Sequence, residues 1–360
     1  MVSPSPAVDP VAARLDRFLD DIRIRSAEYG PDAVLFLDAA IATLSGGKRL
    51  RARFCHTGAL AASGVDDFPD ADALWGLGAA LEIFQSAALV HDDLIDNSDT
   101  RRGRPASHRA LEAAHRAAGW SGDAEAFGRS AAVLLGDLLV AWSDDLLEET
   151  LVGHPRAAAV RSEYARMRRD VTVGQMLDIA EESAWSVSAP EALLERALRV
   201  AALKSARYSV EEPIVLGAIL AGADAGLVAA LRAFGHPVGM AFQLRDDVLG
   251  VFGDPAATGK PAGDDLREGK RTALIAIARE NLGIEERAWV DAGIGDPQLS
   301  DDDIARMQEL IRSSGALARV EEMIAGYTAD AAAALAAAGL SAEATQSLRA
   351  LAEAAIARSA

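Results

Sequence analysis

Three aspartates, Asp92, Asp93 and Asp96, follow directly after an apolar stretch. Residues four apart lie on one face of a helix, so Asp92 and Asp96 are expected to project together. Two carboxylates placed in this way repel each other unless a cation lies between them. Magnesium suits the position, because it takes oxygen ligands and is commonly held by one or two carboxylates together with substrate phosphates. The motif alone could equally be an acidic helix end that faces solvent.

A second acidic pair, Asp246-Asp247, follows another apolar run at residues 238–242, with Gln243 close by. Residues 87–90, just before the first motif, are apolar on every face, which predicts a buried helix with its acidic end at the rim of the core. Two such helices could bring their acidic ends together across a cavity. This arrangement would suit several Mg²⁺ ions that hold one diphosphate.

Basic residues form a few groups in a chain whose formal net charge is −18. Residues 46–51 place two glycines before Lys48, Arg49 and Arg51 at a helix start, where free N–H groups and the helix dipole favour anions. Arg101-Arg102-Gly103-Arg104 follows the first acidic motif and could pair with those aspartates or with an anion. Each group, taken alone, could also be a solvated basic turn.

Further basic positions follow apolar or acidic segments. Lys204 ends an apolar run and could extend to solvent or reach a phosphate. Gly259-Lys260-Pro261 and Gly269-Lys270-Arg271 lie in the long polar stretch that follows the second acidic pair. This stretch could close over a site and exclude water, as lids do, or be a surface loop.

Composition favours an all-α protein and excludes several classes of site. Half of the residues are hydrophobic but only 5 % are aromatic, and the helix formers Ala and Leu dominate. The acidic balance is the opposite of that of a nucleic-acid binder. One cysteine, Cys55, excludes a disulfide within the chain and argues against a cysteine-based metal site.

The expected elements form one large helical domain over residues 11–360, preceded by a tail at 1–10. Residues 1–10 carry no signal-peptide pattern, and the apolar stretches 75–90 and 213–223 are too short for a membrane span, so we expect a cytoplasmic protein. Helices are expected over 12–29, 31–44, from 48 onward, and over 72–96. Loop composition marks residues 101–105, 119–123, 183–190, 253–269 and 291–303.

Taken in order, these residues closely resemble the trans-isoprenyl diphosphate synthases, or polyprenyl synthetases. The matching segments are residues 46–51, His91-Asp92-Asp93-Leu94-Ile95-Asp96, Arg101-Arg102-Gly103, Gly136-Asp137, Gly174-Gln175, Lys204-Ser205, residues 242–247 and Gly259-Lys260-Pro261. The resemblance covers about residues 18–282. It implies a single all-α domain with helices around a central cavity (the isoprenoid synthase fold), usually a homodimer. It also implies head-to-tail condensation of isopentenyl diphosphate with an allylic diphosphate, which could be dimethylallyl, geranyl or farnesyl diphosphate.

The resemblance also implies roles for individual residues. Asp92, Asp96 and Asp246 would hold Mg²⁺, three ions with substrate bound, and Asp93 and Asp247 would lie nearby. The allylic diphosphate would be held by Arg101, Lys204, Ser205, Gln243 and Lys260. Isopentenyl diphosphate would be held by Gly47, Lys48, Arg51, Gln85 and Arg102. The residues implied in catalysis are Asp92, Asp93, Asp96, Arg101, Lys204, Asp246 and Lys260.

Three positions depart from the family pattern. Gly250 stands where the second acidic motif commonly ends in a third aspartate, so this motif lacks one carboxylate and Asp246 is expected to suffice for the metal. Gln85 stands where many members have histidine, although an amide can still donate a hydrogen bond. Ser205 replaces the commoner threonine and keeps the hydroxyl.

Product length is expected to depend on Ala87 and Ala88, which lie about one helical turn before Asp92. Small side chains there permit a long product, so geranylgeranyl diphosphate is expected, with farnesyl or longer polyprenyl products as alternatives. A class I terpene synthase derived from a prenyl synthase is one rival interpretation, although it would not need the basic group at 46–51. A non-catalytic regulatory subunit is another, although it would be expected to lose the first acidic motif.

Overall fold

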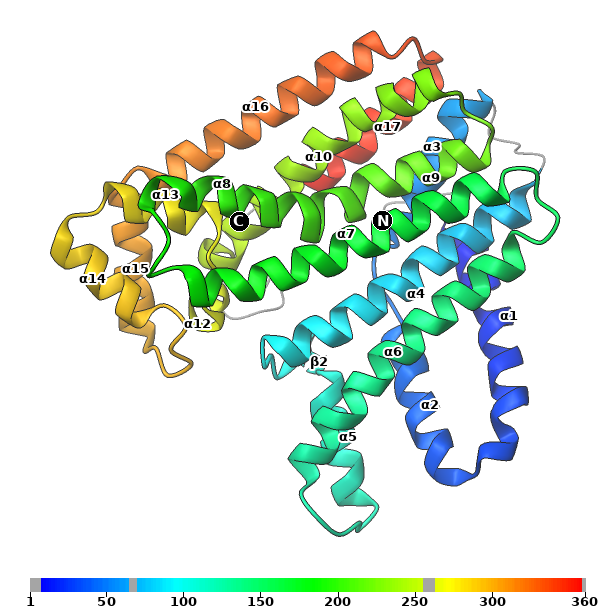
Figure 1. Ribbon diagram of the computed structural model, residues 1–360, viewed down its shortest axis with the longest axis horizontal. Coiled ribbons are helices and arrows are strands. Elements are labelled where there is room, and N and C mark those ends of the chain that lie inside the picture. Colours follow the sequence, from blue (N-terminus) through cyan, green and yellow to red (C-terminus); the bar gives the residue numbers. More distant parts are fainter. Residues whose placement is uncertain (1–7, 65–69, 255–262, 358–360) are drawn as a thin grey trace.

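The computed structural model describes residues 8–64, 70–254 and 263–357, and this part of the chain is almost entirely helical (Figure 1). The all-α class is therefore confirmed. In Figure 1, α4, α6 and α7 run diagonally across the molecule, and α14 and α15 form one end. The helices are α1 (Val8–Ser26), α2 (Pro31–Thr43), α3 (Leu50–Ser63), α4 (Ala71–Ile95), α5 (Ser107–Ala117), α6 (Ala124–Thr150), α7 (Ala157–Ala184), α8 (Leu193–Val200), α9 (Glu212–Leu220), α10 (Ala225–Phe252), α12 (Asp264–Glu268), α13 (Ala273–Asn281), α14 (Ile284–Gly293), α15 (Asp301–Ser313), α16 (Ala316–Ala337) and α17 (Ala342–Ile356).

Most expected boundaries are close to the observed ones, and three differ. Helix α1 begins at Val8, earlier than the expected start at residue 12. The expected loop 101–105 is a short hairpin of strands β1 (Thr100–Arg101) and β2 (Arg104–Pro105). Part of the expected polar loop 253–269 forms α12, while residues 255–262, including Gly259, Lys260 and Pro261, lie outside the described residues.

Helix α4 is the central element of the core. Its first turn is capped by the Asp70 carboxylate, which accepts a hydrogen bond from the Ala73 N–H. Buried side chains then follow on all faces of the helix, as its apolar sequence predicts. Helices α1, α3 and α6 pack around it, so its acidic end is carried to the edge of the core.

Two helices, α4 and α10, are long and apolar enough to cross a membrane by length and composition alone. The expectation that the apolar stretch 75–90 is too short was therefore wrong about length, because that stretch belongs to a 25-residue helix. Burial explains the apolar surface of α4 instead, since 78 % of its most apolar window lies inside the protein. This is the pattern of a core helix.

The segment η3 (Ala201–Glu211) is a π-helix between α8 and α9, and it carries Lys204. It lies in very close contact with α7 and α10, because both helices present glycine to its backbone. A Cβ on Gly174 would lie 2.4 Å from the Lys204 backbone nitrogen, and a Cβ on Gly239 would lie 2.3 Å from the Ala206 carbonyl oxygen. Because these two positions carry no side chain, the backbone of η3 can lie directly against α7 and α10.

A buried group of charges holds the other end of η3. Arg166 and Arg232 both contact Glu163 and Glu212, and Arg232 also donates to Glu211 at 3.0 Å. Burial and a hydrogen bond to Glu163 raise the pKa of Glu212, so its carboxyl group keeps a proton. Burial opposes ionisation of Glu163 as well, but hydrogen bonds from Glu212 and both arginines outweigh it and lower the pKa of Glu163. The junction of η3 and α9 is thus held by two arginines and by a glutamate pair in which Glu163 is ionised and Glu212 is protonated.

The contact between η3 and α10 gives a matched pair of substitutions. Gly239→Ala is expected to destabilise the protein by about 2 kcal/mol, because the new methyl group meets backbone rather than a movable side chain. Gly326→Ala, in α16, has nothing within 4 Å of its new Cβ and is expected to be neutral or to stabilise by up to about 1 kcal/mol. Thermal unfolding followed by circular dichroism checks both. Equal melting temperatures for the two variants would contradict the tight contact at Gly239.

Candidate active site

The first acidic motif lies at the C-terminal end of α4, and its three carboxylates do not share one role. Asp92 lies 2.9 Å from the Lys204 ammonium and 3.4 Å from Arg101. Asp93 turns into the protein and accepts a hydrogen bond of 2.7 Å from Nε of Arg101. Asp92 therefore faces basic residues of two other elements, β1 and η3, while Asp93 fixes the arginine that follows the motif.

Lys204 joins α4 to α7. Its ammonium lies 2.5 Å from Asp178, on α7, as well as next to Asp92. Burial acts against its charge, but these two carboxylates outweigh burial and raise the pKa of Lys204. Asp178 was missed in the sequence, although it lies four residues after Gly174 and so on the same face of α7.

Lys270 links the two acidic regions and was not among the expected site residues. Its ammonium lies 3.4 Å from Asp96, 2.7 Å from Glu268 and 3.7 Å from Asp265. Burial and the neighbouring Asp92 raise the pKa of Asp96 to about 6. Lys270 lies in the turn after α12, so its position depends on a fold that brings this turn against the end of α4. Ser98 completes that contact, since its hydroxyl donates to Glu268 at 2.7 Å.

The second acidic pair is divided between surface and interior. Asp246 is exposed, whereas Asp247 is buried and accepts a hydrogen bond of 2.7 Å from Gln243. Burial raises the pKa of Asp247 to about 8, and the carboxylates of Asp265 and Asp246 add to this shift. Asp246 is thus the member of the pair that presents a carboxylate at the surface.

Gly250, where a third acid is missing from the second motif, lies against a carboxylate from elsewhere in the chain. A Cβ on Gly250 would be 1.9 Å from Oδ2 of Asp265 and 2.3 Å from its Cγ. The Asp265 carboxylate therefore occupies the space that a side chain at position 250 would need. Asp265 belongs to α12, and no local pattern in the sequence indicates that the two positions meet.

A second group of basic residues has few acids around it. Gly46 and Gly47 adopt φ values of 77° and 88°, which lets the chain turn before α3, and the Arg102 guanidinium lies over Gly47. A Cβ on Gly47 would lie 3.1 Å from Nη1 of Arg102. Burial and the positive charges of Arg101, Arg49 and Arg51 lower the pKa of Arg102. Arg102 therefore lies against the turn that begins the segment 46–51, and Lys48 lies exposed in the same turn.

Glu82 is an acid inside this second group, and it contacts the start of α3. Its carboxylate accepts a hydrogen bond of 3.1 Å from the Ala52 N–H and lies 3.8 Å from Arg49. It is also the one charged residue in the apolar stretch 75–90. That isolated charge was the signal that could have identified it.

The remaining expected residues lie beside these two groups. Gln85 is half-buried on α4, and its side-chain oxygen accepts a hydrogen bond from Tyr208 of η3. Ser205 is half-buried next to Lys204, and Ala87 is buried while Ala88 is half-buried. Lys260 lies outside the described residues.

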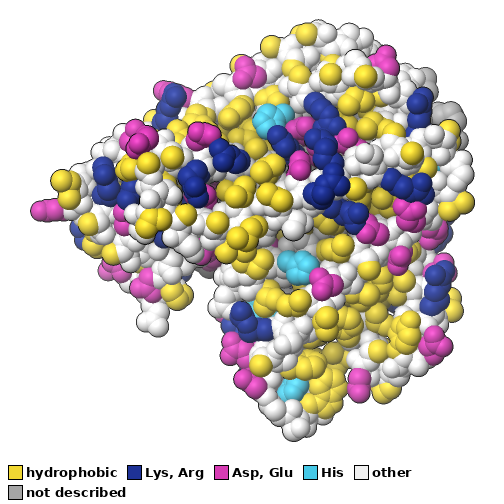
Figure 2. Space-filling model, in the orientation of Figure 1, with side chains coloured by type: hydrophobic (Ala, Val, Ile, Leu, Met, Phe, Trp, Pro, Cys, Tyr) yellow, Lys and Arg dark blue, Asp and Glu magenta, His cyan; other side chains and the backbone are white. Residues whose placement is uncertain are grey.

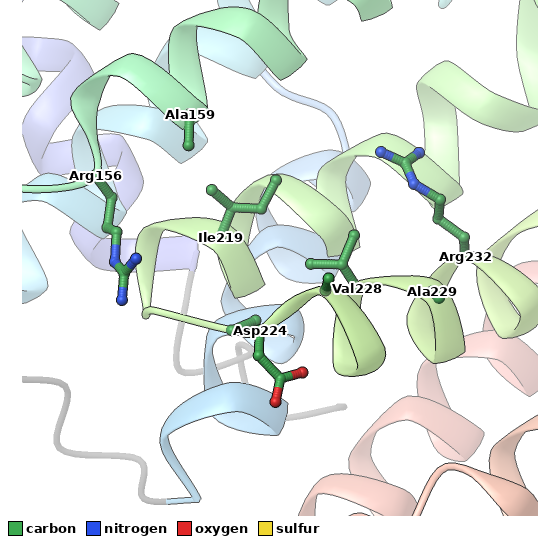
Figure 3. A pocket seen from close by; sticks show the side chains of 9 residues that line it. Arg156, Ala159, Ile219, Asp224, Val228, Ala229 and Arg232 are labelled. Carbon is green, nitrogen blue, oxygen red and sulfur yellow. The ribbon is translucent and has the colours of Figure 1, made fainter.

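A pocket of about 420 Å³ lies elsewhere, between the start of α7, the end of α9 and the start of α10 (Figure 3). Arg156, Asp224 and Arg232 are its charged residues, and its other lining residues are apolar. Arg232 is already bound to three glutamates. None of the expected site residues lines this pocket.

Comparisons with known proteins agree with this arrangement. Residues 35–311 match the family described as polyprenyl synthetase. The chain is 34 % identical to a geranylgeranyl diphosphate synthase of Mycobacterium tuberculosis over 77 % of this chain and 71 % of that protein. It is 33 % identical to a geranylfarnesyl diphosphate synthase of Aeropyrum pernix over 76 % of this chain and 78 % of that protein.

A solved structure gives the same result in three dimensions. A geranylgeranyl pyrophosphate synthase from Corynebacterium glutamicum, in complex with isoprenyl diphosphate and magnesium, superimposes with a TM-score of 0.90. It is 41 % identical, and the match covers 97 % of this chain and 98 % of that one. The chain therefore belongs to the polyprenyl synthetase family and is a trans-prenyltransferase.

Proposed function

We propose that this enzyme condenses isopentenyl diphosphate head-to-tail with an allylic diphosphate in a magnesium-dependent reaction. The observation that carries the proposal is the presence of two neighbouring basic groups of different character. One, built on Lys204, Lys270 and Arg101, is interleaved with carboxylates. The other, built on Arg49, Arg51 and Arg102, contains one acid, Glu82, and keeps a surplus of positive charge. An enzyme that joins two diphosphates needs two anion sites, only one of which must also hold metal.

The donor set suits Mg²⁺. Oδ2 of Asp96 is buried and accepts no hydrogen bond, and the aspartates offer the oxygen ligands that Mg²⁺ prefers. Among residues 8–64, 70–254 and 263–357, no three acidic, histidine or cysteine side chains already form a metal cage. This is consistent with a site completed by substrate phosphates. Asp92, Asp96 and Asp246 would hold the ions, three with substrate bound, and Mg²⁺ would neutralise the charge that develops on the leaving diphosphate.

The protein's own residues account for the rest of the reaction. Lys204, Lys270 and Arg101 would bind the allylic diphosphate and stabilise it as the C–O bond breaks. The double bond of isopentenyl diphosphate then attacks the allylic cation and forms the new C–C bond. The proton lost from the resulting cation passes to the released diphosphate. No protein nucleophile is required for these steps.

We propose that Asp265 supplies the negative charge that Gly250 does not. Support comes from the 1.9 Å that would separate a Cβ at position 250 from the Asp265 carboxylate. A side chain at position 250 would displace the Asp265 carboxylate, and an aspartate there would also meet it as a like charge at short range. Asp265 would then complete the second acidic motif in the folded protein, although the motif lacks its third acid in the sequence.

We propose geranylgeranyl diphosphate as the product. Ala87 and Ala88 are small side chains on α4, one turn before Asp92. The next turn carries Phe84, whose ring lies edge-on to Tyr164 and Tyr208 with centroids 6.3 and 5.8 Å apart. This aromatic layer would stop growth beyond the alanines, and it favours an intermediate length over a very long product.

We also propose a homodimer. Helix α6 exposes Val133 and Leu134, at 44 % and 61 % of their surface, and Figure 2 shows apolar side chains gathered over this part of the molecule. Burial of such residues in a second copy would remove apolar surface from water. The cytoplasmic location expected from the sequence stays a prediction.

The decisive assay supplies Mg²⁺, isopentenyl diphosphate and, in separate reactions, dimethylallyl, geranyl or farnesyl diphosphate. Mass spectrometry is expected to find a linear C20 diphosphate from each primer, and chelation of Mg²⁺ by EDTA is expected to abolish it. A cyclic hydrocarbon would instead identify a terpene synthase. No turnover with any primer would favour a regulatory subunit.

Substitution of the alanines tests the product length. Ala87→Phe and Ala88→Phe are each expected to shorten the main product from C20 to C15, because an aromatic ring would fill the space needed by the growing chain. Ala87 is the more buried of the two, so its variant should also lose more thermal stability. Chromatography of the dephosphorylated products gives the chain length. Unchanged C20 product in both folded variants would refute the role of this turn.

A reciprocal exchange tests the pairing of Gly250 with Asp265. Gly250→Asp is expected to lower kcat by about tenfold or more and to raise the Mg²⁺ concentration needed for half activity. The double variant Gly250→Asp/Asp265→Gly should recover part of both losses, because it restores one carboxylate in the shared space. Binding of Mn²⁺ followed by electron paramagnetic resonance reports the metal independently of turnover. Failure of the double variant to improve on Gly250→Asp would contradict the pairing.

A further inference from the structure

Tyr208 lies at the point where the two proposed substrate sites meet. It belongs to η3, one π-helical segment that also carries Lys204 and Ser205 of the allylic site. Its side chain points instead towards α3 and α4, where it contacts Arg51 and Gln85 of the isopentenyl diphosphate site. Tyr208 therefore contacts α3 and α4, which carry the residues proposed to bind isopentenyl diphosphate. It belongs itself to η3, which carries residues proposed to bind the allylic diphosphate.

The Tyr208 hydroxyl fixes the orientation of the Gln85 amide. The hydroxyl donates to the side-chain oxygen of Gln85, which leaves the NH₂ group of the amide to face away from Tyr208. Burial raises the pKa of Tyr208, so the hydroxyl keeps its proton and stays a donor. An amide held in this way offers N–H donors, as a phosphate oxygen requires. Gln85 stands where related enzymes commonly have histidine, so its orientation needs a partner of this kind.

The Tyr208 ring supports Arg51. The guanidinium carbon of Arg51 lies 4.1 Å from the ring centroid, which is the geometry of a cation–π contact. The neighbouring Ser209 hydroxyl accepts a hydrogen bond of 2.6 Å from Arg51. Nε of Arg51 is buried and has no hydrogen-bond partner, so the arginine keeps a donor for an incoming anion.

The Tyr208 ring is itself immobilised. It is buried, and Phe84 lies edge-on to it. The segment η3 cannot move freely, because Gly174 and Gly239 hold it closely between α7 and α10. The orientation of Gln85 and Arg51 therefore follows the position of η3.

We propose that Tyr208 is a positioning residue for isopentenyl diphosphate: its hydroxyl aims the Gln85 amide and its ring holds Arg51, so that the second site is set by the segment that binds the first substrate. The inference rests on the proposed function, because it needs isopentenyl diphosphate to bind beside Arg51 and Gln85. It assigns Tyr208 no contact with the reacting atoms.

The test removes one hydroxyl. Tyr208→Phe keeps the ring and the contact with Arg51 but loses the hydrogen bond to Gln85, so KM for isopentenyl diphosphate is expected to rise about three- to tenfold. KM for the allylic diphosphate and kcat should stay within about twofold. Titration calorimetry with isopentenyl diphosphate alone, which cannot turn over, should show the same loss of affinity.

Tyr164→Phe is the matched control. Tyr164 is also buried, also lies edge-on to Phe84, and donates to the Ala80 carbonyl oxygen at 3.2 Å rather than to a substrate ligand. This variant should leave KM for isopentenyl diphosphate unchanged. Equal effects of the two substitutions would assign Tyr208 a merely structural role and overturn the proposal.

A double-mutant cycle separates positioning from independent effects. Gln85→Ala should raise KM for isopentenyl diphosphate, and Tyr208→Phe should add little to it, because both changes remove the same oriented amide. Additive effects would overturn the coupling. Ser209→Ala gives a second measurement, since it should weaken isopentenyl diphosphate binding through Arg51 even if Tyr208→Phe does not fold.

The proposed function and this inference fail in different ways. If the wild-type enzyme does not consume isopentenyl diphosphate, the proposed function fails and the inference fails with it. If the wild-type enzyme makes a prenyl diphosphate but Tyr208→Phe binds isopentenyl diphosphate normally, the inference alone is wrong.

Discussion

The repulsion between carboxylates at the end of α4 is the constraint on which the site depends. Asp92 and Asp96 lie in a largely buried region, where like charges repel strongly. Lys204 and Lys270 come from two other parts of the chain to lie against them, at 2.9 and 3.4 Å. Each lysine also binds a further acid, Asp178 or Glu268, so the charges form an alternating network. These ion pairs also hold together the parts of the chain that supply the charged residues.

The sequence predicted the parts of this site that depend on local spacing. The helical repeat placed Asp92 and Asp96 on one face, and the apolar run before them predicted the buried helix correctly. Asp178 and Glu82 were missed, and Lys270 was noted only as part of a basic group in a polar loop, because each gains its role through contacts between elements far apart in the chain. The pairing of Gly250 with Asp265 was hidden for the same reason, since no local pattern connects α10 to α12.

The π-helical form of η3 could not be predicted either. Residues 201–211 have an ordinary helical composition, and the wider turn arises from packing. Gly174 and Gly239 allow α7 and α10 to approach the backbone of η3, while Arg166 and Arg232 fix its last residues. Because η3 is held on two sides and at one end, it keeps Lys204 and Tyr208 at fixed positions relative to each other. The close contacts between η3 and its neighbouring helices thus set the relative positions of the two groups of proposed substrate-binding residues.

The buried Cys55 has a practical consequence for experiments on this enzyme. It is the one cysteine in the chain, it has no exposed surface, and burial raises the pKa of its thiol, which suppresses the reactive thiolate. Its carbonyl oxygen also lies against Gly217, so α3 and α9 cover it from the side. A cysteine introduced on the surface would then be the only thiol open to a maleimide. Fluorophores or spin labels could be attached at chosen points of the wild-type background.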